Sequence, residues 1–217
     1  MKIKAVVWDM DGLLIDSEPI WNAARKEIAG ENGVNWNQQD HFNVMGVSTI
    51  EWTEYMIERI GLTLPPEEVK NLVIDHMAAM YAKEIPFRPY ALEKIEWAAS
   101  LYPSCIASGS PRQLIDIVSA HPMIAKSMQF TLAADEVGPG KPDPAIYIEA
   151  AKRLNIEPAA CLCIEDSPNG VLSGSRAGMR VINIPDPEMP LTAEQAGHAD
   201  VVLKDLSELT EALVNSL

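Results

Sequence analysis

The sequence predicts an α/β protein whose core is a doubly wound, mostly parallel, Rossmann-like sheet that carries an inserted α-helical domain. Short apolar segments alternate with segments of helical periodicity over most of the 217 residues, and this alternation is typical of parallel strands joined by helices. One long stretch after the first apolar segment contains helical patterns and no strand pattern. The alternation predicts the sheet, and the stretch that interrupts it predicts the insertion.

Six segments have the near-continuous apolar character of strands that are buried on both faces. They cover residues 3–8, 104–108, 130–134, 161–165, 180–184 and 199–203. Between them, apolar residues recur at helical spacing, which predicts a face shared by Tyr147, Ile148, Ala151 and Leu154 and a closing helix with Leu206, Leu209 and Leu213. Asp143 is the predicted N-cap of the helix that contains Tyr147, with Pro144 in its first turn.

The interruption places a helical domain at residues 16–86 and the α/β catalytic core at residues 1–15 and 87–217. Ile20, Ala24 and Ile28 recur every fourth residue, and Ser48 with Glu51 forms a capping-box pattern before a further helical segment. The chain is expected to pass between the two domains near residues 14–17 and 85–89.

The formal net charge of −14 argues against binding to nucleic acid or to anionic membranes, because both are bound by basic surfaces. A small phosphorylated metabolite remains compatible with it, since a metal ion and a lysine can make a pocket locally positive. No apolar run is long enough to cross a bilayer, and the N-terminus lacks the features of a secretory signal, so we expect a cytoplasmic protein. Composition leaves the oligomeric state open, and a monomer is compatible with it.

The three cysteines, Cys105, Cys161 and Cys163, lie in apolar segments and have no metal-binding spacing. We therefore expect free, buried thiols in a reducing compartment.

Polar residues stand where the predicted strands end, which is where open α/β sheets bind ligands. The residues after the first segment are Asp9 and Asp11, and the second segment ends in Ser108 and Gly109. Lys141 lies in the loop after the third segment, and the fourth ends in Glu165 and Asp166. Parallel strands would bring all of these residues to one edge of the sheet.

Several carboxylates in one place repel one another and resist ionisation, and a hard divalent cation such as Mg2+ relieves that repulsion. We expect Asp9 and Asp166 to be direct ligands, together with the backbone carbonyl of Asp11. Glu165 is expected either to bind the metal directly or to bind it through one water molecule.

A cation held in this way would bind phosphate oxygens on its open side, with Ser108, the Gly109 amide and Lys141 as further donors. Asp9 could then attack phosphorus. Asp11 could protonate the leaving oxygen and later deprotonate the water that hydrolyses the aspartyl-phosphate.

The segments "DMDGLLIDS", "ASGSP", "GKPDP" and "IEDSPNG" resemble, in order, the four motifs of the haloacid dehalogenase superfamily. The chain looks like the phosphatase and β-phosphoglucomutase-like branch, whose cap is a helical bundle inserted after the first strand, and is most similar there to sugar-phosphate phosphatases. The resemblance implies a nucleophile, an acid–base, a phosphate-binding serine and lysine, and acidic metal ligands, which are matched here by Asp9, Asp11, Ser108, Lys141, Glu165 and Asp166.

Two alternatives to the phosphatase stay open. β-Phosphoglucomutases carry a histidine near the position of Trp21 and an arginine at that of Thr49, so the resemblance favours a phosphatase over a mutase. A signalling domain that is phosphorylated on aspartate also groups acids, a hydroxyl and a lysine on an α/β sheet, but the helical insertion and Asp11 argue against it.

The residues that would contact the leaving group have no motif. Trp21, Met45 and Trp52 either line the substrate pocket or pack within the helical domain. Arg25 and Lys26 either meet a substrate or lie on a solvated helix face.

Overall fold

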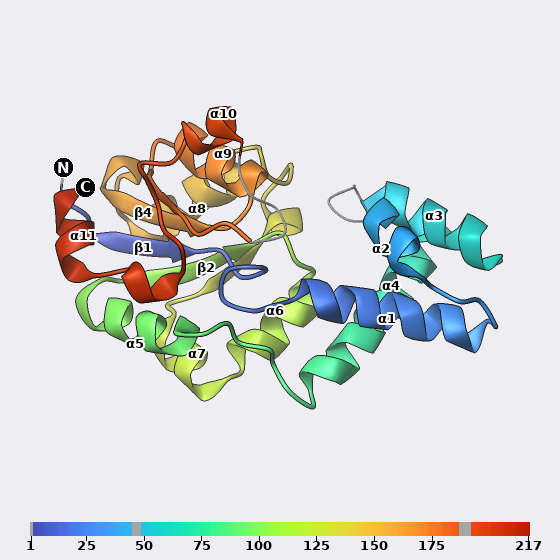
Figure 1. The fold of residues 1–217 in the computed structure, drawn as a ribbon. Helices are drawn as coiled ribbons and strands as arrows, with labels where there is room; N and C mark the ends of the chain where they lie inside the picture. The colour runs from blue at the N-terminus through green and yellow to red at the C-terminus, as the bar shows by residue number, and fades with distance from the viewer. Residues whose placement is uncertain (1, 45–48, 187–191) are drawn as a thin grey trace. The chain divides into compact units, whose positions relative to one another are not determined.

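The computed structural model describes residues 2–44, 49–186 and 192–217. The chain divides into two compact units, one formed by Met1–Asp16 with Pro86–Leu217 and the other by Ser17–Ile85 (Figure 1). We call them the core unit and the helical unit.

The core unit contains a six-stranded sheet in the order β3-β2-β1-β4-β5-β6, and every neighbouring pair is parallel. The strands are β1 (Ala5–Trp8), β2 (Ser104–Ser108), β3 (Thr131–Ala133), β4 (Cys161–Glu165), β5 (Arg180–Asn183) and β6 (Val201–Val202). The predicted α/β fold class is confirmed. All residues of β1, β2 and β4 are buried, which is why these segments lack a polar alternation in the sequence.

Helices cover both faces of this sheet. The core helices are α5 (Ala91–Leu101), α6 (Arg112–Ser119), α7 (Pro122–Ser127), α8 (Ala145–Leu154), α9 (Pro168–Arg176), α10 (Ala193–Ala196) and α11 (Glu211–Ser216). Three short 3-10 turns accompany them: η1 (Ala134–Glu136), η2 (Pro158–Ala160) and η3 (Leu206–Glu208). Helices α8 and α9 lie on one side of the sheet and α5 and α7 on the other (Figure 1).

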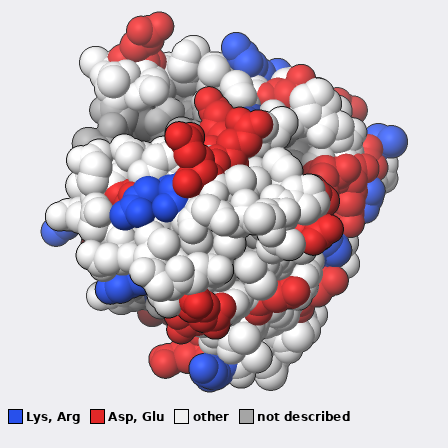
Figure 2. All heavy atoms as spheres, turned by 90° about the vertical axis from the view of Figure 1, so that its right-hand side faces the viewer, with Lys and Arg blue, Asp and Glu red and all other residues white. Residues whose placement is uncertain are grey.

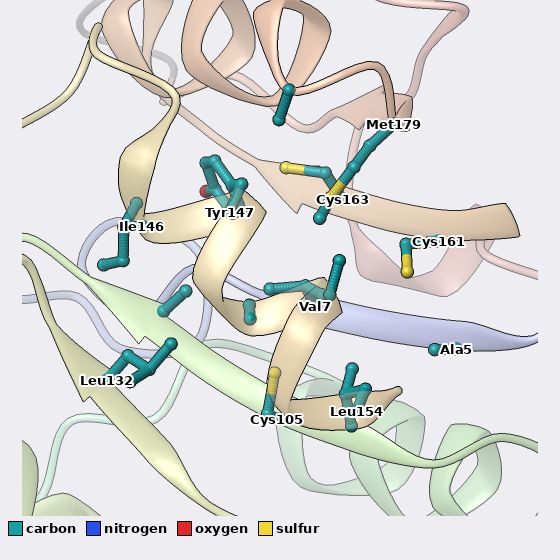
Figure 3. Close-up of a cluster of buried hydrophobic side chains, with 14 of the residues drawn as sticks. Ala5, Val7, Cys105, Leu132, Ile146, Tyr147, Leu154, Cys161, Cys163 and Met179 are labelled. Carbon is teal, nitrogen blue, oxygen red and sulfur yellow. The ribbon is translucent and has the colours of Figure 1, made fainter. Parts of the chain in front are cut away.

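One register row explains how the sheet packs under α8. Val7 is paired with both Cys105 and Cys163, and Cys163 is paired in turn with Val181. These side chains form one buried hydrophobic cluster with Tyr147 and Leu154 of α8, part of which is shown in Figure 3. The three cysteines are free and buried.

The structure corrects two details of the predicted helices. In α8 the buried stripe is Ile146, Tyr147, Ala150, Ala151 and Leu154, whereas Ile148 is 46% exposed. The helix begins at Ala145 rather than at Pro144, and Asp143 Oδ1 accepts a hydrogen bond from the Ala145 amide at 2.9 Å.

The predicted closing helix is divided into η3 and α11. Asp205 Oδ1 accepts from the Ser207 amide at 2.8 Å and so caps η3, while Thr210 Oγ1 accepts from the Leu213 amide at 3.3 Å and caps α11. Two separate caps so close together start two short helices instead of one. The outer strands β3 and β6 are also shorter than the predicted segments 130–134 and 199–203.

The helical unit consists of α1 (Glu18–Glu31), α2 (Gln38–Val44), α3 (Thr49–Ile60) and α4 (Pro66–Tyr81). Ala24 and Ile28 of α1 are buried, as their spacing predicts. Ser48 of the predicted capping box lies outside the described residues, as does Met45. A buried Asp40 joins α2 to α3, because its Oδ1 accepts from Tyr55 Oη and from Arg59 Nε, each at 2.8 Å.

The chain leaves and re-enters the core unit at one place. The Asp16 amide donates to the Pro86 carbonyl at 2.8 Å, and the Arg88 amide donates to the Leu14 carbonyl at 2.9 Å. Arg88 Nη2 also donates to Asp16 Oδ1 at 3.1 Å and to Asp186 Oδ2 at 2.5 Å. The two crossing segments therefore pair with each other within the core unit.

The surface charge agrees with the acidic composition. On the face shown in Figure 2, Asp and Glu side chains gather into several patches, whereas Lys and Arg lie mostly apart from one another. Among the residues that the structure describes, none of the helices combines the length and the apolar character needed to cross a bilayer.

Candidate active site

The carboxyl ends of three adjacent strands carry the predicted site residues. Asp9 follows β1, Ser108 ends β2 on one side of it, and Glu165 ends β4 on the other. Because the three strands are parallel, their ends lie side by side, and the loop after η1 brings Lys141 to them. The structure thus gathers at one edge residues that are far apart in the sequence.

Lys141 links two acids at this edge. Its Nζ donates to Asp9 Oδ1 at 2.5 Å, to Glu165 Oε1 at 2.6 Å and to the carbonyl of Ala107 at 3.1 Å. These contacts use all three protons of the ammonium group. Burial alone would lower the pKa of Lys141, but the charges of Asp9 and Glu165 outweigh it and raise that pKa above its ordinary value. Lys141 is therefore a permanent cation at the strand ends.

Glu165 is a fully buried carboxylate with donors on both oxygens. Oε1 accepts from Lys141 and from the hydroxyl of Tyr147 at 2.6 Å. Oε2 accepts from the Asp166 amide at 3.1 Å and from the Ser167 hydroxyl at 3.2 Å. Burial alone would raise the pKa of Glu165, but Lys141 and these donors outweigh burial and lower it. Glu165 is thus held as an anion.

Three carboxylates form a compact cluster. One oxygen from each of Asp9, Glu165 and Asp166 lies within 4.8 Å of the others, which is close enough to hold one metal ion. Burial raises the pKa of Asp9 well above its ordinary value, against the opposing charge of Lys141. Burial also raises the pKa of Asp166, and the negative charges of Asp9 and Glu165 raise it further. A divalent cation would relieve this strain and is the ligand that such a cluster fits.

Gly12 permits the close approach of Asp166 to the first strand end. Its φ is +79°, and a Cβ on it would lie 2.0 Å from Asp166 Oδ2. A side chain at this position would therefore meet both a backbone penalty and a collision. Glycine at position 12 is therefore required both by the turn after β1 and by the space that Asp166 occupies.

Asp11 is part of a second chain of hydrogen bonds. Its Oδ2 accepts from Ser108 Oγ at 3.0 Å, and Ser108 Oγ accepts from the Ser110 amide at 2.9 Å. The other oxygen, Asp11 Oδ1, is buried and has no hydrogen-bond partner among the described residues. Gly109 lies between the two serines, is exposed, and has open space where a side chain would be.

Several residues of this edge carry no motif signal. Tyr147 is predicted as part of an apolar helix face, yet its hydroxyl binds Glu165. The sequence offers one indication of this role: a tyrosine hydroxyl at a position predicted to be buried needs a hydrogen-bond partner. Gly170 also contributes to the site without a sequence motif, because a Cβ on it would lie 1.9 Å from Glu165 Cδ. Only the folded structure shows that contact.

Trp21 and Trp52 lie in the helical unit and contact each other. The rings of Trp21 and Trp52 meet edge to face, with centroids 6.1 Å apart. Arg25 is buried beside them and Lys26 is exposed.

Comparisons with known proteins agree on the class of this chain. The family description "haloacid dehalogenase-like hydrolase" matches residues 3–178. The chain is 31% identical to a probable pseudouridine-5'-phosphatase of Drosophila melanogaster, over 95% of this chain and 91% of that protein. It is 29% identical to hexitol phosphatase B of Escherichia coli K12, over 96% and 95% of the two chains. A solved HAD family hydrolase from Deinococcus radiodurans R1, with bound phosphate and sodium, is 25% identical, covers 97% of this chain with 95% of its own, and has a TM-score of 0.74.

Proposed function

Because the chain belongs to the haloacid dehalogenase-like hydrolase family, we propose that it is a Mg2+-dependent phosphatase that hydrolyses a small sugar phosphate through a phospho-aspartate on Asp9. The observation that carries the proposal is the pair formed by Asp9 and Asp11. Asp9 is held by a lysine within the carboxylate cluster, and Asp11, two residues on, keeps one buried oxygen that accepts no hydrogen bond from the residues that the structure describes. The first can act on phosphorus, and the second can move a proton.

Asp9 is the proposed nucleophile. Its Oδ1 is fixed by Lys141 Nζ, which leaves Oδ2 as the attacking oxygen. The cation of Lys141 offsets the negative charge of an incoming phosphate, so the carboxylate can approach phosphorus. The attack forms the bond from Asp9 to phosphorus and breaks the bond from phosphorus to the leaving oxygen.

Asp11 is the proposed acid and base. Its Oδ1 would donate a proton to the leaving oxygen in the first step. In the second step it would take a proton from the water that attacks the aspartyl-phosphate, which returns Asp9 and Asp11 to their starting states and releases inorganic phosphate. Before a phosphate binds, the hydrogen bond from Ser108 Oγ to Oδ2 positions the carboxyl group.

The donor set fits a bound Mg2+. Asp9 and Asp166 would supply carboxylate oxygens, and the backbone carbonyl of Asp11 would supply a neutral one. Both oxygens of Glu165 already accept hydrogen bonds, which supports a contact through water for this residue. When bound, the cation neutralises the clustered acids and polarises the phosphoryl group.

The proposed phosphate donors are Ser108, the Gly109 amide and Lys141. Ser108 can turn its single proton from Asp11 to a phosphate oxygen. Lys141 has its three protons engaged within the protein, so its contribution to phosphate binding is mainly its charge. Gly109, with open space at its Cα, allows a phosphate to approach the backbone closely.

The substrate class is supported by the relatives. Their names include a pseudouridine-5'-phosphatase, a hexitol phosphatase and a phosphorylated carbohydrates phosphatase, and all of these names specify small phosphorylated metabolites with hydroxyl groups. Residues 17–85 form a compact unit of their own, which supports a cap at about residues 16–86 and a catalytic core at residues 1–15 and 87–217.

The proposal is tested by phosphate release from hexitol phosphates, pseudouridine 5'-phosphate and p-nitrophenyl phosphate, with Mg2+ and with EDTA. We expect turnover that EDTA abolishes and Mg2+ restores, and loss of about 10^3-fold or more in Asp9→Asn. Asp135→Asn, an exposed aspartate outside the site, is the matched control and should keep full activity. Full activity in Asp9→Asn would refute the proposed nucleophile.

A further inference from the structure

Arg112, the first residue of α6, uses every donor of its side chain. Nε donates to Glu136 Oε1 at 2.8 Å and Nη2 donates to Glu136 Oε2 at 2.6 Å, which makes a bidentate pair. Nη1 donates to Thr131 Oγ1 at 2.7 Å and to Asp116 Oδ1 at 3.3 Å, and Nη2 also donates to the Thr131 carbonyl at 3.4 Å. A guanidinium group has five N–H donors, so all five are engaged within the protein. Arg112 thus joins the start of α6 to β3 and η1 within the core unit.

The two segments that Arg112 joins both lead to proposed phosphate donors. Ser108 and Gly109 lie within four residues before Arg112, and Lys141 lies five residues after Glu136. Strand β3 lies at the edge of the sheet, has three residues and pairs with β2, and so short a strand supplies few ladder hydrogen bonds. The pair of Arg112 with Glu136 therefore adds a connection beyond the end of β3 that the sheet does not provide.

The chain between Glu136 and Lys141 has little packing of its own. Residues 138–140 are exposed. Gly138 has a φ of +151°, and a Cβ on it would meet only Ala145 Cβ, at 3.8 Å. Because glycine adds conformational freedom to the backbone, the position of this segment depends on the groups that hold its two ends.

Helix α9 holds the chain directly after Lys141. Ser173 Oγ donates to the Asp143 carbonyl at 2.7 Å, and Arg176 Nη1 donates to the Pro142 carbonyl at 3.2 Å. These contacts fix the backbone on one side of Lys141 and leave the other side to be held by a different group.

Glu136 is the anchor on that other side. Its Oε2 accepts from the Ala133 amide at 3.3 Å as well as from Arg112. The hydrogen bonds from Arg112 lower the pKa of Glu136 below its ordinary value, against the effect of burial, so the pair stays charged at neutral pH. The loop is therefore tied to α9 after Lys141 and to α6 before it.

We infer that Arg112 is a positioning residue, which holds Lys141 in place through Glu136. Lys141 Nζ lies 2.5 Å from Asp9 Oδ1 and 2.6 Å from Glu165 Oε1, so a shift of about 1 Å would break one of these bonds. A misplacement of that size can lower a rate by about 100-fold. The effect on turnover rests on the proposed phosphatase function, whereas the effect on the loop does not.

Arg112→Met tests the inference, because it removes the five donors and keeps an apolar stem. The side chains of Arg112 and Glu136 are 31% and 40% exposed, and exposed ion pairs contribute little to global stability, so we expect a folded variant. Amide hydrogen exchange of the peptide that covers residues 134–141 should be about tenfold faster than in wild type. Turnover of p-nitrophenyl phosphate should fall about 10- to 100-fold, mostly in kcat, because Lys141 is bonded to the proposed nucleophile.

The matched control is Arg180→Met at the start of β5. Arg180 Nη1 donates to Asp200 Oδ1 at 2.7 Å, and Asp200 also accepts from the Val181 amide at 2.8 Å, so this pair resembles that of Arg112 but lies away from the loop. The control should leave both the exchange of residues 134–141 and kcat unchanged. Arg112→Lys keeps the charge and loses the bidentate geometry, so it should resemble Arg112→Met rather than wild type.

A double-mutant cycle shows whether Arg112 acts through Lys141. In a Lys141→Met background, Arg112→Met should change the remaining kcat by less than about twofold, whereas a purely structural ion pair would lower kcat by the same factor in both backgrounds. If turnover of Lys141→Met is too slow to measure, the affinity for inorganic phosphate in Mg2+, measured by calorimetry, replaces kcat in the cycle.

Exchange of residues 134–141 within about twofold of wild type in Arg112→Met would overturn the inference, and so would an equal loss in both backgrounds of the cycle. If Arg112→Met fails to fold, Glu136→Gln takes its place, and the same two results would overturn the inference. If the wild-type protein hydrolyses no phosphate ester, the proposed function fails, and the exchange of residues 134–141 still decides whether Arg112 holds the loop.

Discussion

The hydrogen bond from Tyr147 to Glu165 can be removed by deleting a single oxygen atom, which tests how much this bond contributes to the stability of the protein. Tyr147→Phe deletes the hydroxyl that donates to Glu165 Oε1 at 2.6 Å, and both residues are fully buried. The phenyl ring keeps its packing, so no large cavity forms. A hydrogen bond to a charged group contributes about 1.5–3 kcal/mol. We therefore expect the free energy of unfolding to fall by about this amount.

Burial raises the pKa of Tyr147 well above its ordinary value, so the hydroxyl remains a donor throughout the range in which the protein is studied. For a chain of this length, a loss of about 1.5–3 kcal/mol corresponds to a Tm lower by roughly 3–12 °C. Calorimetry of the metal-free protein in EDTA measures it, since a bound cation would add its own stabilisation. Tyr90→Phe, at a residue that is 50% exposed, is the control and should change the stability by less than about 0.5 kcal/mol.

A double-mutant cycle assigns the loss to this bond. In a Glu165→Gln background the acceptor is neutral, so Tyr147→Phe should cost about half as much as in the wild type or less. A Tm of Tyr147→Phe within about 1 °C of wild type would refute the reasoning. An equal loss in both backgrounds would show that the hydroxyl stabilises the protein through some other contact.

Three further predictions follow from other parts of the structure. Gly170→Ala places a Cβ 1.9 Å from Glu165 Cδ, so it should lower the free energy of unfolding by about 1–3 kcal/mol and reduce activity. Gly30→Ala, at a helical glycine with open space around it, is the control and should be neutral or stabilising by up to about 1 kcal/mol. Chemical denaturation of both variants measures the difference. Burial alone would raise the pKa of Asp40, but the Asn37 amide and the Arg59 side chain outweigh burial and lower that pKa. The stabilising effect of the Asp40 carboxylate is therefore complete above about pH 4 and is lost as the pH falls through the lowered pKa. Asp40→Asn should flatten the acid side of a plot of Tm against pH, and an unchanged plot would contradict this. Burial raises the pKa of all three thiols, that of Cys161 to about 11. Native protein at pH 8 should therefore resist alkylation by iodoacetamide, whereas urea-unfolded protein should react at every thiol. Mass spectrometry of the two samples measures the difference.

The strands could be predicted from local sequence because each is buried on both faces and therefore apolar along its length. The same criterion fails for α8 at one position. A helix face is defined by the neighbours against which it packs, and α8 uses Ile146 and Ala150 where Ile148 was expected. The closing segment was predicted as one helix from its leucine spacing, although Asp205 and Thr210 each begin a separate turn. Apolar spacing predicts burial, whereas capping side chains decide where a helix starts.

The sequence by itself determined the fold class and the chemical types at the strand ends, because both depend on residues within one segment: an apolar run, and the acid, serine or lysine after it. Only the tertiary structure decided how those groups are paired. Lys141 stands between Asp9 and Glu165, Tyr147 supports Glu165 from a helix surface, and Gly12 and Gly170 leave the space that two carboxylates occupy. Arg25 and Lys26 are adjacent and similar in charge, yet one is enclosed by tryptophans and the other is solvated. Several of these pairings join residues far apart in the chain, such as Lys141 with Asp9 and Gly12 with Asp166, so they depend on how distant segments pack.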